Sequence, residues 1–242
     1  MTRPAPPLPI LFQDTHLIAV VKPAGWLTQA DATDAPAVTR VLRRWLEAAA
    51  GPGREVFLGL VHRLDRNVAG IVLLARTPRA AAHLAEQIRE RRVRKYYRCW
   101  VEGRPDPPAG RLIHFLRKEK SLKATVFPRD TPKAKRAELS YRTLRAAEKT
   151  TLLEMELHTG RFHQIRAQLS FLGHPVVGDV KYRAAHPLPD RALLLYACRM
   201  VLHHPRTGKE LVLECPPPPG WPETGLPGDA PASGGPHFQR DL

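Results

Sequence analysis

Short apolar segments rich in β-branched and aromatic residues recur along the chain, and each ends at turn-forming residues. This pattern predicts strands rather than helices. The segments are HLIAVVKPAGW (16–26), IVLLA (71–75), RKYYRCWVEG (94–103), a hairpin over 138–158 with a polar break at 148–150, and two strands over 193–214 around the turn at 205–208.

Three other segments space their apolar residues three and four positions apart, which predicts helices. They cover residues 37–51, 77–93 and 161–173, and the second begins with Thr77 as a helix cap and Pro78 at the first helical position. Helices and hairpins are interspersed, without regular alternation of strand and helix. The sequence therefore favours an α+β fold, with a mixed, mainly antiparallel sheet flanked by helices, over a doubly wound α/β fold.

The two ends of the chain differ in composition from its middle. Residues 216–242 hold eight Pro and five Gly, which cannot sustain a helix or an inner strand, and residues 1–9 also lack a periodic pattern. We expect a single domain over 10–215, a flexible N-terminal tail over 1–9 and a disordered C-terminal tail over 216–242.

The net charge of the chain indicates which class of molecule it binds. The chain has 38 Lys and Arg against 23 Asp and Glu, a net charge of +15, which attracts polyanions such as nucleic acid. A merely solubilising surface is the alternative, and the excess of Arg over Lys also follows from a GC-rich genome. No apolar run reaches the ~20 residues of a membrane span, and no signal segment opens the chain, so we expect a cytoplasmic protein without membrane contact.

Motifs of several large enzyme classes are missing from the sequence. It contains no phosphate-binding glycine loop, no dinucleotide fingerprint, no nucleophile elbow and no zinc-protease motif. The three cysteines are widely spaced, and the histidine groups at 158/163 and 203/204 lack ligand spacing, so no metal site is expected. These absences leave two kinds of function: a reaction that needs no cofactor, or binding without catalysis.

Three segments carry candidate chemistry. GLVHRLDRNVAG (59–70) sets one carboxylate, Asp65, among His62, Arg63 and Arg66, just before a predicted buried strand. A carboxylate that must stay ionised in a closed site needs a cation, and Arg supplies a permanent one. KYYRCWVEG (95–103) offers aromatic faces for an unstacked base. TGRFHQIR (159–166) leads to GHPVVGD (173–179).

From about Ile10 to Pro216 the chain resembles the RluA-like family of RNA pseudouridine synthases. HRLD with the following glycine and apolar strand is similar to the nucleophile motif of that family, and KPAGW to its N-terminal strand and turn. KYYRCWVEG matches its Lys-x-Tyr-x-Ala-x-Val-x-Gly strand, and TGRFHQIRAQL with GHPVVGD matches its arginine-bearing helix and the loop beyond. The four motifs occur in family order with fitting separations.

The resemblance implies a pseudouridine synthase-like fold with a central RNA-binding cleft, and a reaction that needs no cofactor or metal. Uridine in RNA is detached at nitrogen 1, turned, and rejoined through carbon 5. Asp65 is then the catalytic nucleophile or base, Tyr97 lies against the target base, and Arg166 keeps Asp65 ionised. Attack on the sugar, attack on the base and removal of a sugar proton all stay open for Asp65.

Phosphate contacts are expected to hold the rest of the RNA, ribosomal or transfer, on a monomeric protein. Arg63 is expected to hold the flipped-out strand, although a structural ion pair fits it as well. The basic helix end at 89–95 and the segment 117–149, with eleven Lys and Arg against four Asp and Glu, are further candidates. The candidate RNA contacts are Arg63, Arg91, Arg92, Lys95, Arg161 and His163.

The sequence departs from the family pattern at a few positions, and two other functions compete. Ala69 replaces the serine that commonly precedes Gly70, Gln168 stands where a histidine is frequent, and Cys99 replaces an alanine. None of these changes removes a proposed catalytic group. A catalytically idle RNA-binding or RNA-folding protein on the same scaffold would not need Asp65, Tyr97 and Arg166 together. A basic hydrolase or nuclease would need a metal cluster or a Ser/His/Asp set.

Overall fold

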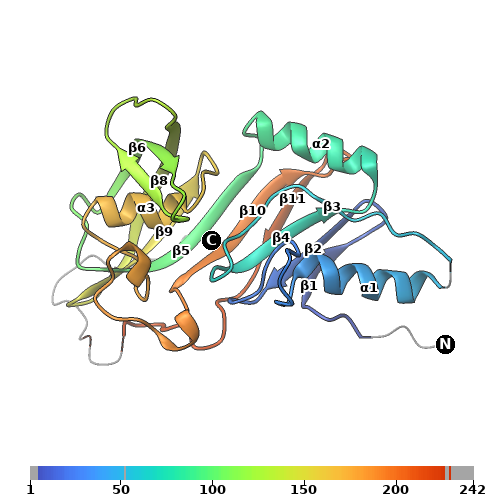
Figure 1. The fold of residues 1–242 in the computed structure, drawn as a ribbon, viewed down its shortest axis with the longest axis horizontal. Coiled ribbons are helices and arrows are strands. Elements are labelled where there is room, and N and C mark those ends of the chain that lie inside the picture. The colour runs from blue at the N-terminus through green and yellow to red at the C-terminus, as the bar shows by residue number, and fades with distance from the viewer. Residues whose placement is uncertain (1–4, 52, 227–228, 230–242) are drawn as a thin grey trace. The chain divides into compact units, whose positions relative to one another are not determined.

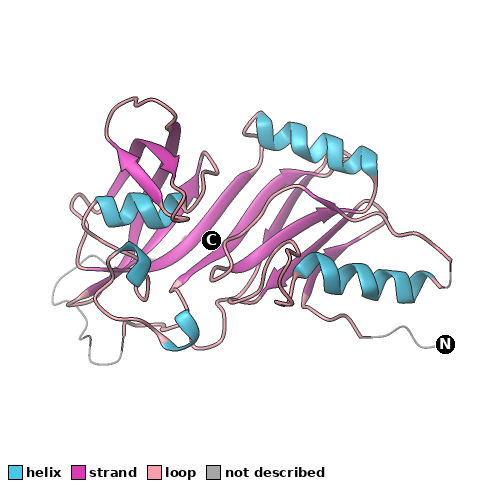
Figure 2. Cartoon of the chain, viewed as in Figure 1, coloured by secondary structure: helices cyan, strands magenta, loops and turns pink. Residues whose placement is uncertain are grey.

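Two units, each built around β-strands with helices beside them, make up the chain in the computed structural model (Figures 1 and 2). The structure describes residues 5–51, 53–226 and 229. Unit 1 comprises residues 1–95 and 196–218, and unit 2 comprises residues 96–195 and 219–242. The α+β class and the mainly antiparallel pairing predicted from the sequence are confirmed within both units.

Strand β4 is the centre of unit 1. It is buried along its whole length and pairs antiparallel with β2 and β3 and parallel with β10. The outer strands β1 and β11 pair antiparallel with β2 and β10. The strands of this unit are β1 (Ile10–Gln13), β2 (Leu17–Lys22), β3 (Gly59–Leu60), β4 (Ala69–Ala75), β10 (Leu195–His203) and β11 (Glu210–Glu214).

Helices α1 (Val38–Ala50) and α2 (Pro78–Arg89) flank the strands of unit 1 (Figure 1). The first buries Leu42, Trp45 and Leu46, which are spaced three and four positions apart as the sequence pattern predicts. The second begins at its expected cap, since the backbone N–H of Ala80 donates to Thr77 Oγ1 at 3.1 Å. Both predicted helices are thus confirmed.

A glycine at position 70 allows two strands of unit 1 to approach closely. Gly70 has a φ of +116°, and a Cβ atom there would lie 2.3 Å from the carbonyl oxygen of Ala197 in β10. No other residue type fits this conformation and this spacing. The close contact fixes the start of β4, immediately after the loop that carries Asp65.

Unit 2 is an antiparallel sheet in the order β5-β9-β8-β6-β7, with short helices beside it. Strand β5 begins two residues before this unit. The elements are β5 (Arg94–Glu102), β6 (Ala109–Lys118), β7 (Ala124–Phe127), β8 (Lys135–Ala146), β9 (Thr150–Leu157), α3 (Gln164–Phe171), and the 3₁₀ turns η1 (Val180–Tyr182) and η2 (Pro189–Arg191).

The sequence pattern does not predict β6 and β7. Of the ten residues of β6, only Leu112 and Leu116 are buried, and charged or partly exposed residues separate them. The strand therefore lacks the apolar alternation by which a half-buried strand is recognised. Leu116 joins a small core that packs α3 against this part of the sheet, formed by Leu116, Ala124, Ala137, Ala167 and Tyr182.

Parts of both predicted tails make contacts. In unit 1, Leu8 is buried and the carbonyl of Pro9 accepts from Val21 N. In unit 2, Trp100 Nε1 donates to the carbonyl of Pro222 at 3.0 Å, and Asp229 accepts from the backbone N–H of Lys149 at 2.7 Å. Residues 1–4, 227–228 and 230–242 lie outside the described residues, and disorder of the tails stays a prediction.

No helix within the described residues is long and apolar enough to cross a membrane.

Candidate active site

The loop that carries Asp65 is held by hydrogen bonds on both sides of that residue. On one side, Thr28 Oγ1 donates to the carbonyl of Leu64 at 3.0 Å and accepts from Leu64 N at 3.1 Å. On the other side, Val68 N donates to the carbonyl of Asp65 at 3.1 Å and closes a turn that leads directly into β4. The backbone at Asp65 is therefore fixed by its local sequence and by the buried strand behind it.

A buried lysine secures the same loop. Lys22, at the end of β2, has no exposed surface, and its Nζ donates to the carbonyls of Pro23, Trp26 and Arg66 at 2.9–3.0 Å. Burial lowers the pKa of Lys22 to about 7, while the nearby charge of Asp65 acts in the opposite direction. Lys22 thus joins the turn after β2 to the Asp65 loop and places near the carboxylate an amine that is partly protonated at neutral pH.

Lys22 is not among the functional residues predicted from the sequence. The available signal is its position at the end of the apolar run LIAVVK, in the register of buried residues, where a lysine needs partners for its ammonium group.

His62 has a packing role in this loop. Its Nε2 accepts a hydrogen bond of 2.9 Å from the backbone N–H of Leu73 in β4. Burial, and secondarily the charge of Lys95, lowers the pKa of His62 to about 3. The ring is therefore neutral at physiological pH, and it ties the motif to the strand instead of supplying a cation to Asp65.

Tyr97 and Arg166, the other two predicted catalytic residues, belong to unit 2, whereas Asp65 belongs to unit 1. Tyr97 is 7% exposed and lies on β5 opposite Met155 of β9. The strand alternation puts it on the same face as Cys99 and Val101, which are fully buried. The packed β-sheet holds the ring of Tyr97 in place.

Arg166 forms a buried ion pair inside unit 2. Its Nε donates to Oδ2 of Asp179 at 2.6 Å and its Nη2 donates to Oδ1 at 2.9 Å. Both side chains are almost fully buried, and the guanidinium lies 5.0 Å from the ring centre of Tyr182. Asp179 is recognisable in the sequence only as the end of the motif GHPVVGD, and its pairing with Arg166 was not predicted. The predicted pairing of Arg166 with Asp65 stays a prediction.

Side-chain hydrogen bonds fix the start of the helix that carries Arg166. His163 precedes α3 in the left-handed conformation, with φ 50°, so the chain turns sharply into the helix. Gln164 Oε1 then accepts from Thr159 Oγ1 at 2.7 Å and from Arg161 N at 3.0 Å, while its Nε2 donates to the carbonyl of Glu138. These contacts set the direction from which Arg166 reaches Asp179.

His163, a predicted RNA contact, is packed against aromatic neighbours. It stacks on Phe162 with ring centres 3.9 Å apart, and its Nδ1 shares a 3.0 Å hydrogen bond with the hydroxyl of Tyr182. Burial, together with nearby cations of which Arg166 is the strongest, lowers the pKa of His163 to about 3. A neutral ring brings no charge to a phosphate, so any RNA contact by His163 would rest on hydrogen bonding or stacking.

The other predicted RNA contacts divide between the units. The four arginines among them are exposed, and two have protein partners: Arg92 pairs with Glu90 at 2.6 Å, and Arg161 Nε donates to the carbonyl of Arg136 at 2.9 Å. Burial lowers the pKa of Lys95. The predicted RNA contacts in unit 1 are Arg63, Arg91, Arg92 and Lys95, and the predicted RNA contacts in unit 2 are Arg161 and His163.

Histidine, cysteine and acidic side chains do not gather at one place in the described part of the chain. No group of three or more there could hold a metal ion. The three cysteines are buried, and none of them forms a disulfide bond. His204, one of the grouped histidines, contacts Asp14 at 2.8 Å and accepts from two backbone N–H groups of its own turn, a structural role.

Comparison with known proteins agrees with this assembly of motifs. The sequence model of the family described as RNA pseudouridylate synthase matches residues 16–171. The tRNA pseudouridine synthase C of Salmonella typhi is 34% identical, over 86% of this chain and 84% of the relative. The ribosomal large subunit pseudouridine synthase D of Nitrosomonas europaea is also 34% identical, over 88% of this chain and 62% of the relative.

A solved structure shows the same likeness. Human RNA pseudouridylate synthase domain containing 4 matches with a TM-score of 0.73 and 28% identity, over 88% of this chain and 90% of that one. The family match covers the Asp65 loop, β5 and the part of α3 that carries Arg166. The chain belongs to the RNA pseudouridylate synthase family, in the RluA-like group that its motifs resemble.

Proposed function

We propose that the protein converts specific uridines of transfer RNA or large-subunit ribosomal RNA to pseudouridine, with Asp65 as the catalytic carboxylate. The observation that carries this proposal is the Asp65 loop itself, which a buried lysine and a buried threonine fix at the start of β4. In a family of RNA-modifying isomerases, one rigidly held carboxylate near a buried lysine suits a reaction that must be started by an ionised group.

The reaction is an isomerisation and balances without a cofactor. The bond between nitrogen 1 of the base and the sugar breaks, and a bond between carbon 5 and the same sugar carbon forms. Carbon 5 loses a proton, and nitrogen 1 gains one. Asp65 acts as the nucleophile or base that starts this exchange, and the target uridine must first leave its stack to reach it.

Two residues of unit 2 complete the proposed machinery. Tyr97 lies against the target base from a packed strand, and Arg166 keeps Asp65 ionised. The bidentate pair with Asp179 fixes the orientation of the guanidinium that would serve this role.

The choice of RNA is supported by the names of the relatives. The Salmonella relative is named for tRNA and the Nitrosomonas relative for the ribosomal large subunit, and both are 34% identical to this chain. The proposal therefore includes both classes of RNA. A monomeric state and a cytoplasmic location stay predictions from the sequence.

The proposal is tested by mapping pseudouridines in cellular RNA with and without the gene, and by restoring either the wild type or Asp65→Asn. We expect one or a few sites to vanish on deletion, to return with the wild type and to stay absent with the variant. The variant is nearly isosteric, so its fold and RNA affinity should be close to normal. Normal modification by a folded Asp65→Asn protein would end the assignment, and an unchanged map on deletion would reject the activity.

A further inference from the structure

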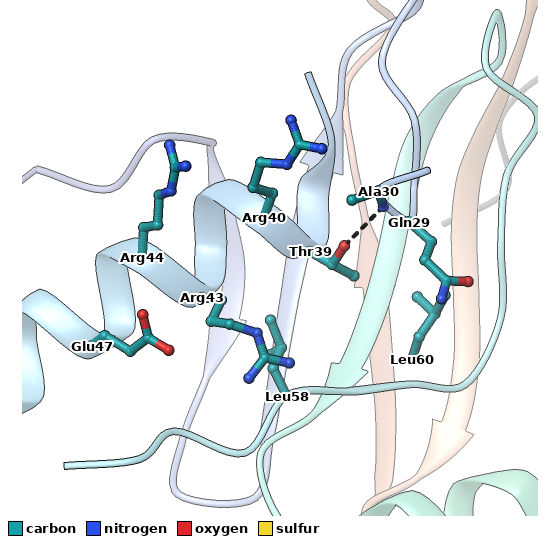
Figure 3. A pocket seen from close by; sticks show the side chains of 9 residues that line it. All are labelled: Gln29, Ala30, Thr39, Arg40, Arg43, Arg44, Glu47, Leu58 and Leu60. Carbon is teal, nitrogen blue, oxygen red and sulfur yellow. Dashed lines mark hydrogen bonds between the residues drawn. The ribbon is translucent and has the colours of Figure 1, made fainter. Parts of the chain in front are cut away.

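An open, basic groove lies along helix α1 in unit 1. It has a volume of about 550 Å³, within the range of known ligand sites. Figure 3 shows basic side chains projecting from α1, with Gln29 and Leu60 across from them and Leu58 below. The residues that line this α1 groove are Gln29, Ala30, Thr39, Arg40, Arg43, Arg44, Glu47, Leu58 and Leu60.

The charge of the α1 groove suits a polyanion. Three arginines line it against a single carboxylate, Glu47. Arg43 has a structural duty, because its Nη1 donates to the carbonyl of Val56 at 3.1 Å and holds the loop after α1. Arg44 is exposed, and Arg40 is partly exposed with a 3.3 Å hydrogen bond to the carbonyl of Thr33 at the surface. Their guanidinium groups are well suited to phosphate oxygens.

The wall of the α1 groove is hydrogen-bonded to the Asp65 loop. Gln29 follows Thr28, whose hydroxyl makes two hydrogen bonds with the backbone of Leu64, the residue before Asp65. The start of α1 is attached to the same segment, since Val38 N donates to the carbonyl of Leu27 at 2.9 Å. The α1 groove and the proposed catalytic carboxylate therefore belong to one rigid part of unit 1.

We propose that the α1 groove binds the backbone phosphates of RNA nucleotides that flank the target uridine, with Arg40 and Arg44 as the phosphate contacts. This inference rests on the proposed function, because it takes the RNA to be the one that reaches Asp65. Leu58 and Leu60 give the lining an apolar part that suits a sugar or a base edge, and Gln29 and Thr39 offer sequence-independent hydrogen bonds. None of the basic segments singled out from the sequence includes this helix.

The test is the salt dependence of RNA binding by the full-length double variant Arg40→Gln/Arg44→Gln, with unfractionated transfer RNA as the probe. Each phosphate contact contributes about 0.7 to 0.9 to the slope of log affinity against log salt. We expect the slope to become shallower by about 1.5 units and the Kd at low salt to rise. The matched control is Arg206→Gln/Lys209→Gln, which removes two exposed cations of the same unit from the β10–β11 hairpin.

The control variant should keep the wild-type slope and Kd. If both variants weaken binding equally, the effect is general charge and the α1 groove has no special role. An unchanged slope in the groove variant would also overturn the proposal, and would leave the α1 groove to a partner other than RNA. A third variant, Arg40→Lys/Arg44→Lys, keeps the charge and should keep the slope, which guards against a loss that comes from misfolding.

A failure of the proposed function can be distinguished from a failure of the α1 groove proposal, because the first is measured by activity and the second by RNA binding. It would appear as wild-type protein that binds RNA with a normal salt slope and forms no pseudouridine in transfer or ribosomal RNA. The α1 groove would still be tested by the slopes of the variants, because binding is measured without reference to catalysis.

Discussion

Asp179 holds Arg166 by two hydrogen bonds, of 2.6 Å to Nε and 2.9 Å to Nη2, with both side chains almost fully buried. Such a bidentate pair fixes the plane of the guanidinium as well as its charge. The pair joins α3 to the residue before η1, and the two side chains are thirteen residues apart in the chain. Arg166 is therefore a directed cation whose orientation is set within unit 2.

Replacing Asp179 with Asn should weaken both the fold and the reaction. The change leaves the buried guanidinium without its counter-charge, which costs about 3–5 kcal/mol when a buried pair is broken. We also expect slower pseudouridine formation, because Arg166 is no longer held in one orientation. Urea unfolding and single-turnover kinetics measure the two effects. The exposed Asp130→Asn is the control, and an Asp179→Asn protein as stable and as active as that control would deny the pair any importance.

Arg166→Met separates a carboxylate partner from a phosphate contact. If Arg166 keeps Asp65 ionised, the variant slows the chemical step severely. The loss of a neighbouring cation raises the pKa of Asp65, which must be ionised to act. The acidic limb of the pH–activity profile therefore moves to higher pH. The salt slope of RNA binding should barely change. If Arg166 contacts a phosphate instead, the salt slope of RNA binding should become shallower by about one unit. The acidic limb of the pH–activity profile should then stay where it is in the wild type.

Much of this site follows from sequence patterns, and the remainder depends on contacts that no pattern displays. The Asp65 motif precedes a strand that is recognisable because it is apolar throughout, and α1 and α2 show clear helical spacing. Lys22 and Asp179 are not recognisable in this way. Each is a buried charge with a partner that no local pattern displays: Lys22 reaches the carbonyl of Arg66, 44 residues away, and Asp179 pairs with Arg166, 13 residues away. Strand β6 is missed for another reason, since it buries too few side chains to show alternation.

Lys22→Met should loosen the Asp65 loop while preserving the volume of the buried side chain. Three carbonyl oxygens, those of Pro23, Trp26 and Arg66, lose their donor. These bonds are only partly buried, so each loss should cost less than the about 1–3 kcal/mol of a fully buried unpaired acceptor. We expect a fall in the free energy of unfolding and a lower rate of modification. The exposed Lys209→Met is the matched control. If activity survives intact in a destabilised Lys22→Met protein, Lys22 supports the fold but not the position of Asp65.

The C-terminal segment should contribute modestly to stability, contrary to what its Pro- and Gly-rich composition suggests. Pro222 accepts from the buried Trp100, and Asp229 accepts from Lys149 N and from the hydroxyl of Thr150. Deleting residues 221–242 removes these bonds, each worth about 1 kcal/mol, so the melting temperature should drop by several degrees. Asp229→Ala alone should reproduce part of the drop. A truncated protein with the same melting temperature as the full chain would show that these contacts add nothing to stability.

His62 should make the fold sensitive to acid. Its folded pKa, about 3, lies below the ordinary value of 6.5, so below pH 6.5 the unfolded chain binds a proton that the folded chain does not. The stability that comes from a neutral His62 is fully present above pH 6.5 and is lost as the pH falls towards 3, at up to about 1.4 kcal/mol per pH unit. Burial is the main cause of this direction, and the charge of Lys95 adds to it. Protonation would also break the bond from Leu73 N, because a protonated ring cannot accept it.

His62→Gln keeps an acceptor for Leu73 N and removes the titration. We therefore expect the free energy of unfolding of the variant to fall less steeply than that of the wild type between pH 6 and pH 4, and the two curves to run parallel above pH 7. Urea unfolding at a series of pH values measures both slopes. Other acid-labile groups, such as Asp14 with its lowered pKa, are common to the two proteins and cancel in the difference. Equal slopes through the acidic range would mean that His62 titrates freely and is not held neutral by β4.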